Sequence, residues 1–103
     1  MNTSDILTVE DYRVVVALLN EEFDAHNFIT VYSSLYAAKY LALLRICKGD
    51  FALVNSRIAI FLRDSANTLE IERVTDGNGD NTVIESENIK TNSSNNSCWK
   101  KRQ

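Results

Sequence analysis

The side chains that could carry out catalysis are few in this chain of 103 residues. It has one histidine, His26, and two cysteines, Cys47 and Cys98, which are far apart in the sequence. These groups are too few for a zinc site unless acidic residues join them. The three glycines fall at expected turns, so no glycine-rich phosphate loop is present. We therefore expect a non-enzymatic protein that uses no cofactor.

The acidic segment 76–87, DGNGDNTVIESE, places oxygen-bearing side chains at the spacing of a calcium-binding loop. It resembles the EF-hand loop, whose ligand positions 1, 3, 5, 7 and 12 correspond to Asp76, Asn78, Asp80, Thr82 and Glu87. However, position 6 is Asn81 instead of the usual glycine, and the flanking segments do not read as helices. The favoured interpretation is a tight turn between two strands, and calcium binding is the alternative.

A different chemistry is indicated by residues 50–64, DFALVNSRIAIFLRD. At helical spacing its large apolar residues share one face, which comprises Phe51, Val54, Ile58, Phe61 and Leu62. The opposite face carries small and basic side chains, namely Ala52, Ser56, Ala59, Ile60 and Arg63. Asp50 is the expected N-cap, and Gly49 is expected to end the preceding helix. Such a helix has one buried face and one face free to contact a partner.

The preceding residues are expected to form further helices. Thr8 is an expected N-cap, and apolar residues at spacings of three and four predict a helix over 9–23. Asp24 is expected to cap a second helix over 25–32, with a break near Ser33–Ser34, and a third helix is expected over 35–48. One continuous helix over 27–48 is the alternative. We expect a loop over 65–68.

The C-terminal third is expected to form a β-hairpin followed by a polar tail. Apolar and charged residues alternate over 69–74, and the turn at 76–81 predicts a β-hairpin over about 69–87. Residues 91–97 are a polar Ser/Asn run, expected to be a long loop or disordered. Trp99 then either docks, as a short third strand or a plug at the edge of the core, or lies in a floppy tail from about residue 90.

Composition and charge restrict the class of protein. Apolar residues make up 45% of the chain, which is enough for the core of a single domain over 1–103. We find no secretory signal and no apolar run long enough to span a membrane, so we expect a cytoplasmic protein without membrane contact. The net charge of −3 conceals two basic blocks, 25–63 and 90–103, between acidic ones. These blocks could share one surface.

The order of helices, a tight turn at 48–50, a further helix and a hairpin resembles a winged helix-turn-helix domain. The resemblance implies an α+β fold with three to four N-terminal helices followed by a β-hairpin wing at about 69–87. It implies duplex DNA as the partner and regulation of transcription as the function. The helix at 50–64 would be the recognition helix, and its base-reading positions would be Ala52, Asn55, Ser56, Arg57 and Ala59. Phosphate contacts would come from Arg45, Lys48, Arg63, Lys100, Lys101 and Arg102.

The chain departs from that pattern at two places. The expected wing tip carries Asp76 and Asp80, and the apolar positions of the helix offer few hydrogen bonds to bases. The alternative function is therefore a protein-interaction module of the same fold, an adaptor or a homodimer. DNA binding requires the basic residues to share a face, whereas an adaptor predicts that Leu53 and Ile60 are exposed and the bases scattered.

Overall fold

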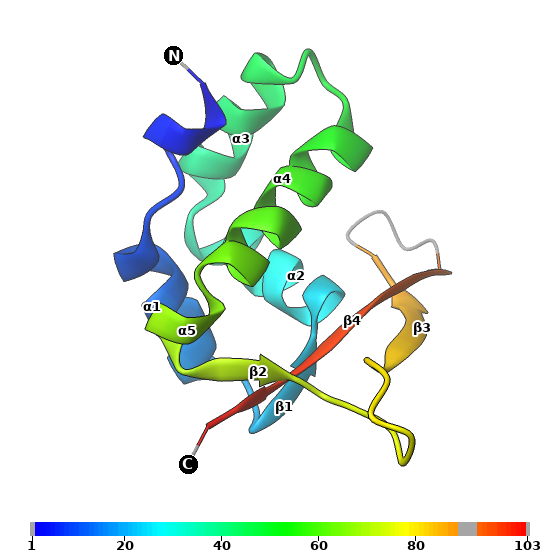
Figure 1. Ribbon diagram of the computed structural model, residues 1–103. Helices are drawn as coiled ribbons and strands as arrows, with labels where there is room; N and C mark the ends of the chain where they lie inside the picture. Colours follow the sequence, from blue (N-terminus) through cyan, green and yellow to red (C-terminus); the bar gives the residue numbers. More distant parts are fainter. Residues whose placement is uncertain (1, 89–92, 103) are drawn as a thin grey trace.

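The computed structural model describes residues 2–88 and 93–102 and shows an α+β domain in which helices precede an antiparallel sheet (Figure 1). The helical part comprises η1 (Thr3–Asp5), α1 (Val9–Leu18), α2 (Ala25–Leu35), α3 (Ala37–Ile46), α4 (Phe51–Asp64) and α5 (Ala66–Leu69). The strands are β1 (Glu22–Asp24), β2 (Ile71–Arg73), β3 (Val83–Glu87) and β4 (Ser93–Lys101). The expected α+β class is confirmed.

Side-chain caps begin the long helices where the sequence predicted them. Thr8 accepts a hydrogen bond from the Asp11 amide at the start of α1, and Asp24 and Asn27 form a reciprocal capping box on α2. Asp50 accepts a hydrogen bond from the Leu53 amide at the start of α4. These bonds satisfy amides that have no partner within the helix.

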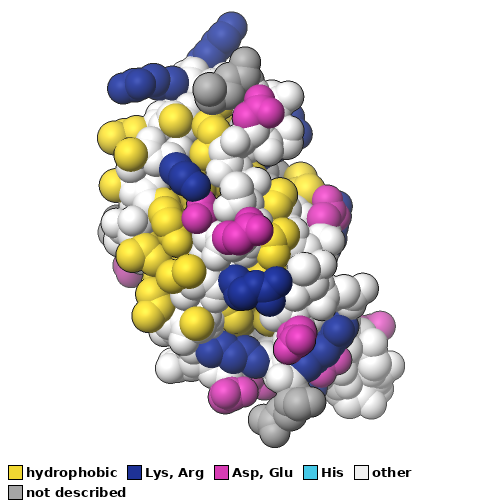
Figure 2. All heavy atoms as spheres, turned by 90° about the vertical axis from the view of Figure 1, so that its left-hand side faces the viewer, with side chains coloured by type: hydrophobic (Ala, Val, Ile, Leu, Met, Phe, Trp, Pro, Cys, Tyr) yellow, Lys and Arg dark blue, Asp and Glu magenta, His cyan; other side chains and the backbone are white. Residues whose placement is uncertain are grey.

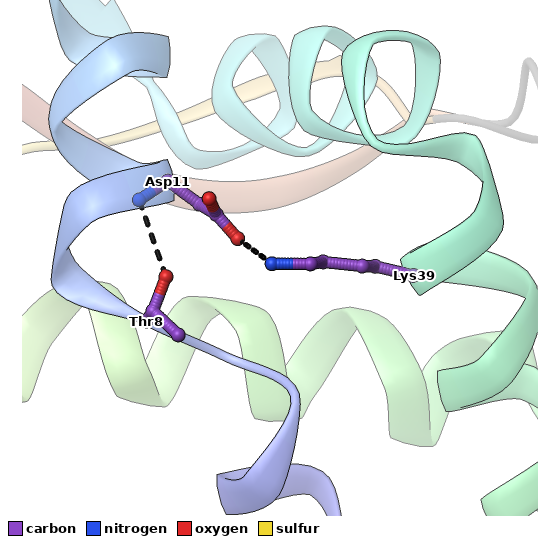
Figure 3. Close-up of polar contacts among 3 residues, drawn as sticks. All are labelled: Thr8, Asp11 and Lys39. Carbon is purple, nitrogen blue, oxygen red and sulfur yellow. Dashed lines mark hydrogen bonds and ion pairs between the residues drawn. The ribbon is translucent and has the colours of Figure 1, made fainter.

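The Asp11 carboxylate itself forms an ion pair with Lys39 and so ties the first turn of α1 to α3 (Figure 3).

Several predicted helix boundaries were wrong. The first helix ends at Leu18 rather than residue 23, because Phe23 reaches the core from β1 with a spacing that happens to continue the helical pattern. The second helix continues through the Ser33–Ser34 pair, where the Ser33 hydroxyl donates to the Thr30 carbonyl. It ends at Leu35, and the φ of −119° and ψ of 51° at Tyr36 exclude one continuous helix. The expected loop at 65–68 contains the short helix α5.

The sheet is organised around β4, which the sequence did not predict as a long strand. Trp99 on β4 pairs with Phe23 of β1 on one side and with Arg73 of β2 on the other. Residues 93–97, which lie in the expected loop or disordered run, pair with β3. Trp99 is 4% exposed and lies on β4, so of the two alternatives it docks, and the floppy tail is wrong for the described residues of this segment. Residues 91 and 92 lie outside the described part of the chain.

The hairpin expected over 69–87 forms only at its turn. Thr75 and Asn81 make an isolated bridge across the turn, but β2 and β3 do not pair with each other and instead follow one another along β4. The Cys98 carbonyl accepts from Val74, and the Cys98 amide donates to Thr82, so both strands bond the same edge of β4. The principal hairpin is therefore β3–β4.

The helices pack on this sheet around an aromatic core. Tyr12 is fully buried, and its ring centroid lies 4.6 Å from that of Phe28 and 4.8 Å from that of Phe61. Its hydroxyl donates to the Ile58 carbonyl over 2.9 Å and so joins α1 to α4. The core thereby fixes which face of α4 is turned inward.

Candidate functional site

The turn before α4 fixes where that helix begins. The Lys48 amide donates to the Arg45 carbonyl and the Gly49 amide to the Leu44 carbonyl, which is the Schellman arrangement at the end of α3. Both Lys48, with φ 54°, and Gly49, with φ 79°, adopt the left-handed conformation. The chain thus reverses within a few residues and starts α4 at Phe51.

The two faces of α4 are those predicted from the sequence. Val54, Ile58 and Leu62 are at most 1% exposed and face the core. The opposite face is open to solvent and presents Ala52, Leu53, Ser56, Ile60 and Arg63. Apolar residues of the inward face therefore position small and basic residues on the outer one.

The outer face of α4 borders two neighbouring hollows. The first has a volume of about 400 Å³ and lies between α4, the start of α2 and β4; its lining includes Ala52, Asn55, Ser56, His26 and residues 94–97. The second, of about 220 Å³, lies nearer the end of α4 and is lined by Ala25, Ser56, Ala59, Ile60, Arg63, Arg73, Ser97 and Trp99. We call the surface formed by these two hollows the α4–β4 surface.

The α4–β4 surface carries hydroxyl, amide, imidazole and guanidinium groups, and among the described residues no Asp or Glu lines either hollow. The chain as a whole has 14 acidic residues against 11 Lys and Arg. Arg63 does pair with Asp64 over 3.2 Å, but both side chains are well exposed and solvent screens such a pair. This surface therefore suits an anionic partner better than the average surface of the protein does.

His26 holds the β3–β4 hairpin in place at one side of the α4–β4 surface. Its Nδ1 lies 3.1 Å from the Ser86 carbonyl oxygen and 2.9 Å from the Ser86 hydroxyl oxygen. Its Nε2 lies 3.2 Å from the Ser94 hydroxyl oxygen. The His26 amide also donates to the Asn96 side-chain oxygen. The sequence gave no signal for this role of His26, because its partners come from β3 and β4.

The predicted nucleic-acid contacts are brought together only in part. Ala52, Asn55, Ser56 and Arg63 lie on the α4–β4 surface. Arg57 lies on the other flank of α4 and lines a hollow with residues 2–4. Arg45 and Lys48 are exposed at the α3–α4 end of the molecule (Figure 1).

The basic residues at the C-terminal end of β4 lie at the opposite end of the molecule (Figure 1). Lys100 is 3.9 Å from Glu72, Lys101 donates to the Leu19 carbonyl, and Arg102 donates to Asn67. The 25–63 and 90–103 blocks therefore do not form one continuous basic face. The reason is that this end of β4 is inserted between β1 and β2. Arg73, by contrast, lies on the α4–β4 surface and was not predicted.

The calcium-loop interpretation receives no support from the geometry. Asp76 accepts hydrogen bonds from the Asn78 and Asp80 amides and so closes its own turn. Glu87 lies on β3 and pairs with Ser93 beyond the turn. Within residues 2–88 and 93–102, no cluster of three His, Cys, Asp or Glu side chains could hold a metal ion.

Exposed hydrophobic side chains gather on a face other than the α4–β4 surface (Figure 2). Figure 2 shows hydrophobic side chains gathered along one edge of it, with Lys and Arg side chains dispersed and several of them beside acidic ones. Large exposed apolar residues on α1–α3 are Val14, Leu18, Leu35 and Leu41. No helix in the described part of the chain combines the length and apolar character needed to cross a bilayer.

Comparisons with known protein families, with curated proteins and with solved structures gave no match to this chain.

Proposed function

We propose that this protein binds duplex DNA through the α4–β4 surface, as a small regulator of transcription or an accessory factor. The observation that carries the proposal is that no acidic side chain of residues 2–88 and 93–102 lines either hollow, in a protein with a net charge of −3. An α-helix with its side chains is about 10–12 Å across, and the major groove is about 12 Å wide. The outer face of α4 can therefore enter a major groove beside the β3–β4 hairpin.

The proposal interprets the domain as a winged helix-turn-helix in which α3 and α4 form the helix pair and β3–β4 forms the wing. The acidic turn with Asp76 and Asp80 lies between β2 and β3, outside the β3–β4 hairpin. The acidic wing tip expected from the sequence is therefore not the part of the wing that borders α4. The β3–β4 wing itself carries the exposed Glu85 and Glu87 on β3, so the acidic character of the wing still counts against DNA binding.

Asn55 is the side chain on α4 best placed to read a base. Its Oδ1 accepts a hydrogen bond from the Tyr40 hydroxyl over 2.6 Å. This bond fixes the orientation of the amide and leaves its NH₂ group available to donate to a base-edge acceptor. Ala52 and Ser56 lie beside it, and the Ala52 methyl can contact the methyl group of thymine.

Fluorescence anisotropy with a duplex, at about 50 mM and about 200 mM salt, tests the proposal. The test variant is Ser56→Glu, which places an acid at an exposed position of the α4–β4 surface. The matched control is Ser34→Glu, which makes the same change at an exposed helical position of α2. We expect binding that weakens steeply with salt, is lost in Ser56→Glu and is retained in Ser34→Glu. No binding by the wild type at the lower salt would refute the proposal.

A protein-interaction module is the second candidate, and two observations favour it over DNA binding: the basic residues do not share one face, and two apolar residues on α4 are exposed. Leu53 is 37% exposed and Ile60 is 39% exposed. If they form a contact between copies, light scattering after size exclusion will give a dimer mass for the wild type and a monomer mass for Ile60→Glu. A monomer mass for both proteins would refute the homodimer form of this candidate.

For either function we place the protein in the cytoplasm, where Cys47 and Cys98 would stay reduced.

A further inference from the structure

We infer that the 220 Å³ hollow between α4 and β2 is a site for one phosphate group, held by Arg63 and Arg73 together. This inference rests on the proposed function and assigns to one phosphate of the bound strand a defined place on the protein. Two arginines that are distant in the sequence line one small hollow, together with the hydroxyls of Ser56 and Ser97. Guanidinium groups and hydroxyls are donors that suit a phosphate oxyanion.

Arg73 is positioned by the sheet rather than by an acidic partner. Its guanidinium carbon lies 5.5 Å from the centroid of the Trp99 ring, and one of its NH₂ groups donates to the Thr82 carbonyl over 3.3 Å. Its Nε is buried and has no hydrogen-bond partner within the described residues. No ion pair of Arg73 occurs in this part of the chain either. A positive charge is therefore fixed beside the hollow and is not held in an ion pair with a described acidic residue.

Arg63 supplies the second charge from a more exposed position. It lies in the last turn of α4, and its side chain is 64% exposed. Its pairing with the similarly exposed Asp64 is weak enough to be exchanged for a phosphate, because solvent screens an exposed pair. The Arg63 guanidinium can thus bind a phosphate group that Arg73 already attracts.

The size of the hollow limits what it can hold. Pockets that enclose drug-sized ligands measure about 300–1,000 Å³, and this hollow has about 220 Å³. A single phosphate fits, whereas a whole nucleotide would have to extend outward over Ile60 and the neighbouring first hollow. The volume of the hollow suits a phosphate group of a DNA strand and free inorganic phosphate equally. The experiment therefore has one arm for each source.

The first arm measures duplex affinity against salt concentration for the wild type, Arg63→Gln, and Arg63→Gln with Arg73→Gln. Each neutralised phosphate contributes about 0.9 to the slope of log K against log salt. If both arginines hold the same phosphate, the double variant loses about 0.9 of the slope, whereas two separate phosphates predict a loss of about 1.8. Arg13→Gln on α1 is the matched control and leaves the slope unchanged. A loss near 1.8, or no loss, would overturn the shared site.

The second arm uses Trp99, the one tryptophan of the chain, whose side chain lines the hollow. Inorganic phosphate is titrated against sodium chloride of equal ionic strength, and the fluorescence of Trp99 is recorded. A saturable change that is absent from Arg63→Gln shows that free phosphate occupies the site. Circular dichroism checks that each variant is folded. Because Arg63 is exposed, the single variant Arg63→Gln is expected to fold, and it still tests the site if the double variant does not.

The two arms separate failure of the site from failure of the proposed function. If the wild type does not bind the duplex, the DNA proposal fails, and the Trp99 titration alone then decides whether the hollow takes phosphate. If the duplex binds with an unchanged slope in the double variant, the DNA proposal survives and the phosphate site is refuted. A slope loss of about 0.9 without a response to inorganic phosphate assigns the site to strand phosphates alone.

Discussion

Replacing Trp99 by alanine should remove much of the stability of the domain. The side chain is 4% exposed, and it stands on β4 between Phe23 of β1 and Arg73 of β2. Truncating a buried aromatic residue costs about 3–5 kcal/mol, and the lost contact with the Arg73 guanidinium adds about 0.5–1 kcal/mol. We therefore expect a loss of roughly 4 kcal/mol from a free energy of unfolding that is typically about 5–15 kcal/mol.

Urea denaturation followed by far-ultraviolet circular dichroism measures this loss without relying on tryptophan fluorescence. In a thermal scan the same loss should lower Tm by roughly 15 °C or more, because about 1 kcal/mol corresponds to at least 4 °C in a domain of this size. Leu41→Ala, at a residue 56% exposed on α3, is the control and should change stability by less than about 0.5 kcal/mol. A loss below about 1 kcal/mol for Trp99→Ala would show that β4 is not what holds the sheet to the helices.

Three further predictions concern the helices. Tyr12→Phe should cost about 1 kcal/mol in urea denaturation, because it deletes the bond from the buried hydroxyl to the Ile58 carbonyl; an unchanged midpoint would contradict that bond. Lys48→Gly should raise the free energy of unfolding by roughly 0.5–1 kcal/mol, since it relieves a left-handed conformation, and a lower stability would argue against that backbone. Burial raises the pKa of Tyr12, Tyr32 and Tyr40 above the value of about 10 in an unfolded chain. The stability linked to these groups should be fully present below about pH 10 and be lost as the pH rises beyond it, which unfolding midpoints at increasing pH will show.

The part of the fold that local signals control could be predicted from the sequence. Thr8, Asp24 and Asp50 all cap helices as expected, because a capping bond reaches only three residues along the chain. The buried face of α4 also followed from its spacing. Phe23 shows the limit of that reasoning. Its spacing from the apolar residues of α1 is that of a helix, yet it reaches the core from the short strand β1.

The side of the candidate site that is formed by strands depends on β4, and no local sequence pattern predicts that strand. Residues 93–97 are Ser and Asn, which have low preference for strands, and they become a strand because β3 pairs with them. Without the position of β4, neither Arg73 nor His26 can be assigned to the surface beside α4. The sequence therefore predicted the helical side of the site and missed the side built by long-range pairing.

The central place of β4 also affects when the protein can fold. β1 lies far before its partner β4 in the sequence, so β4 is synthesised after the other helices and strands of the domain. Until then, Phe23 and Ile71 lack the strand between them, and the helices cannot bury their sheet-facing side chains. Because such contacts are distant in sequence, folding should be slower than in a helical bundle of similar size. The nascent chain would thus expose apolar surface until β4 has been synthesised, which makes it a candidate for chaperone binding.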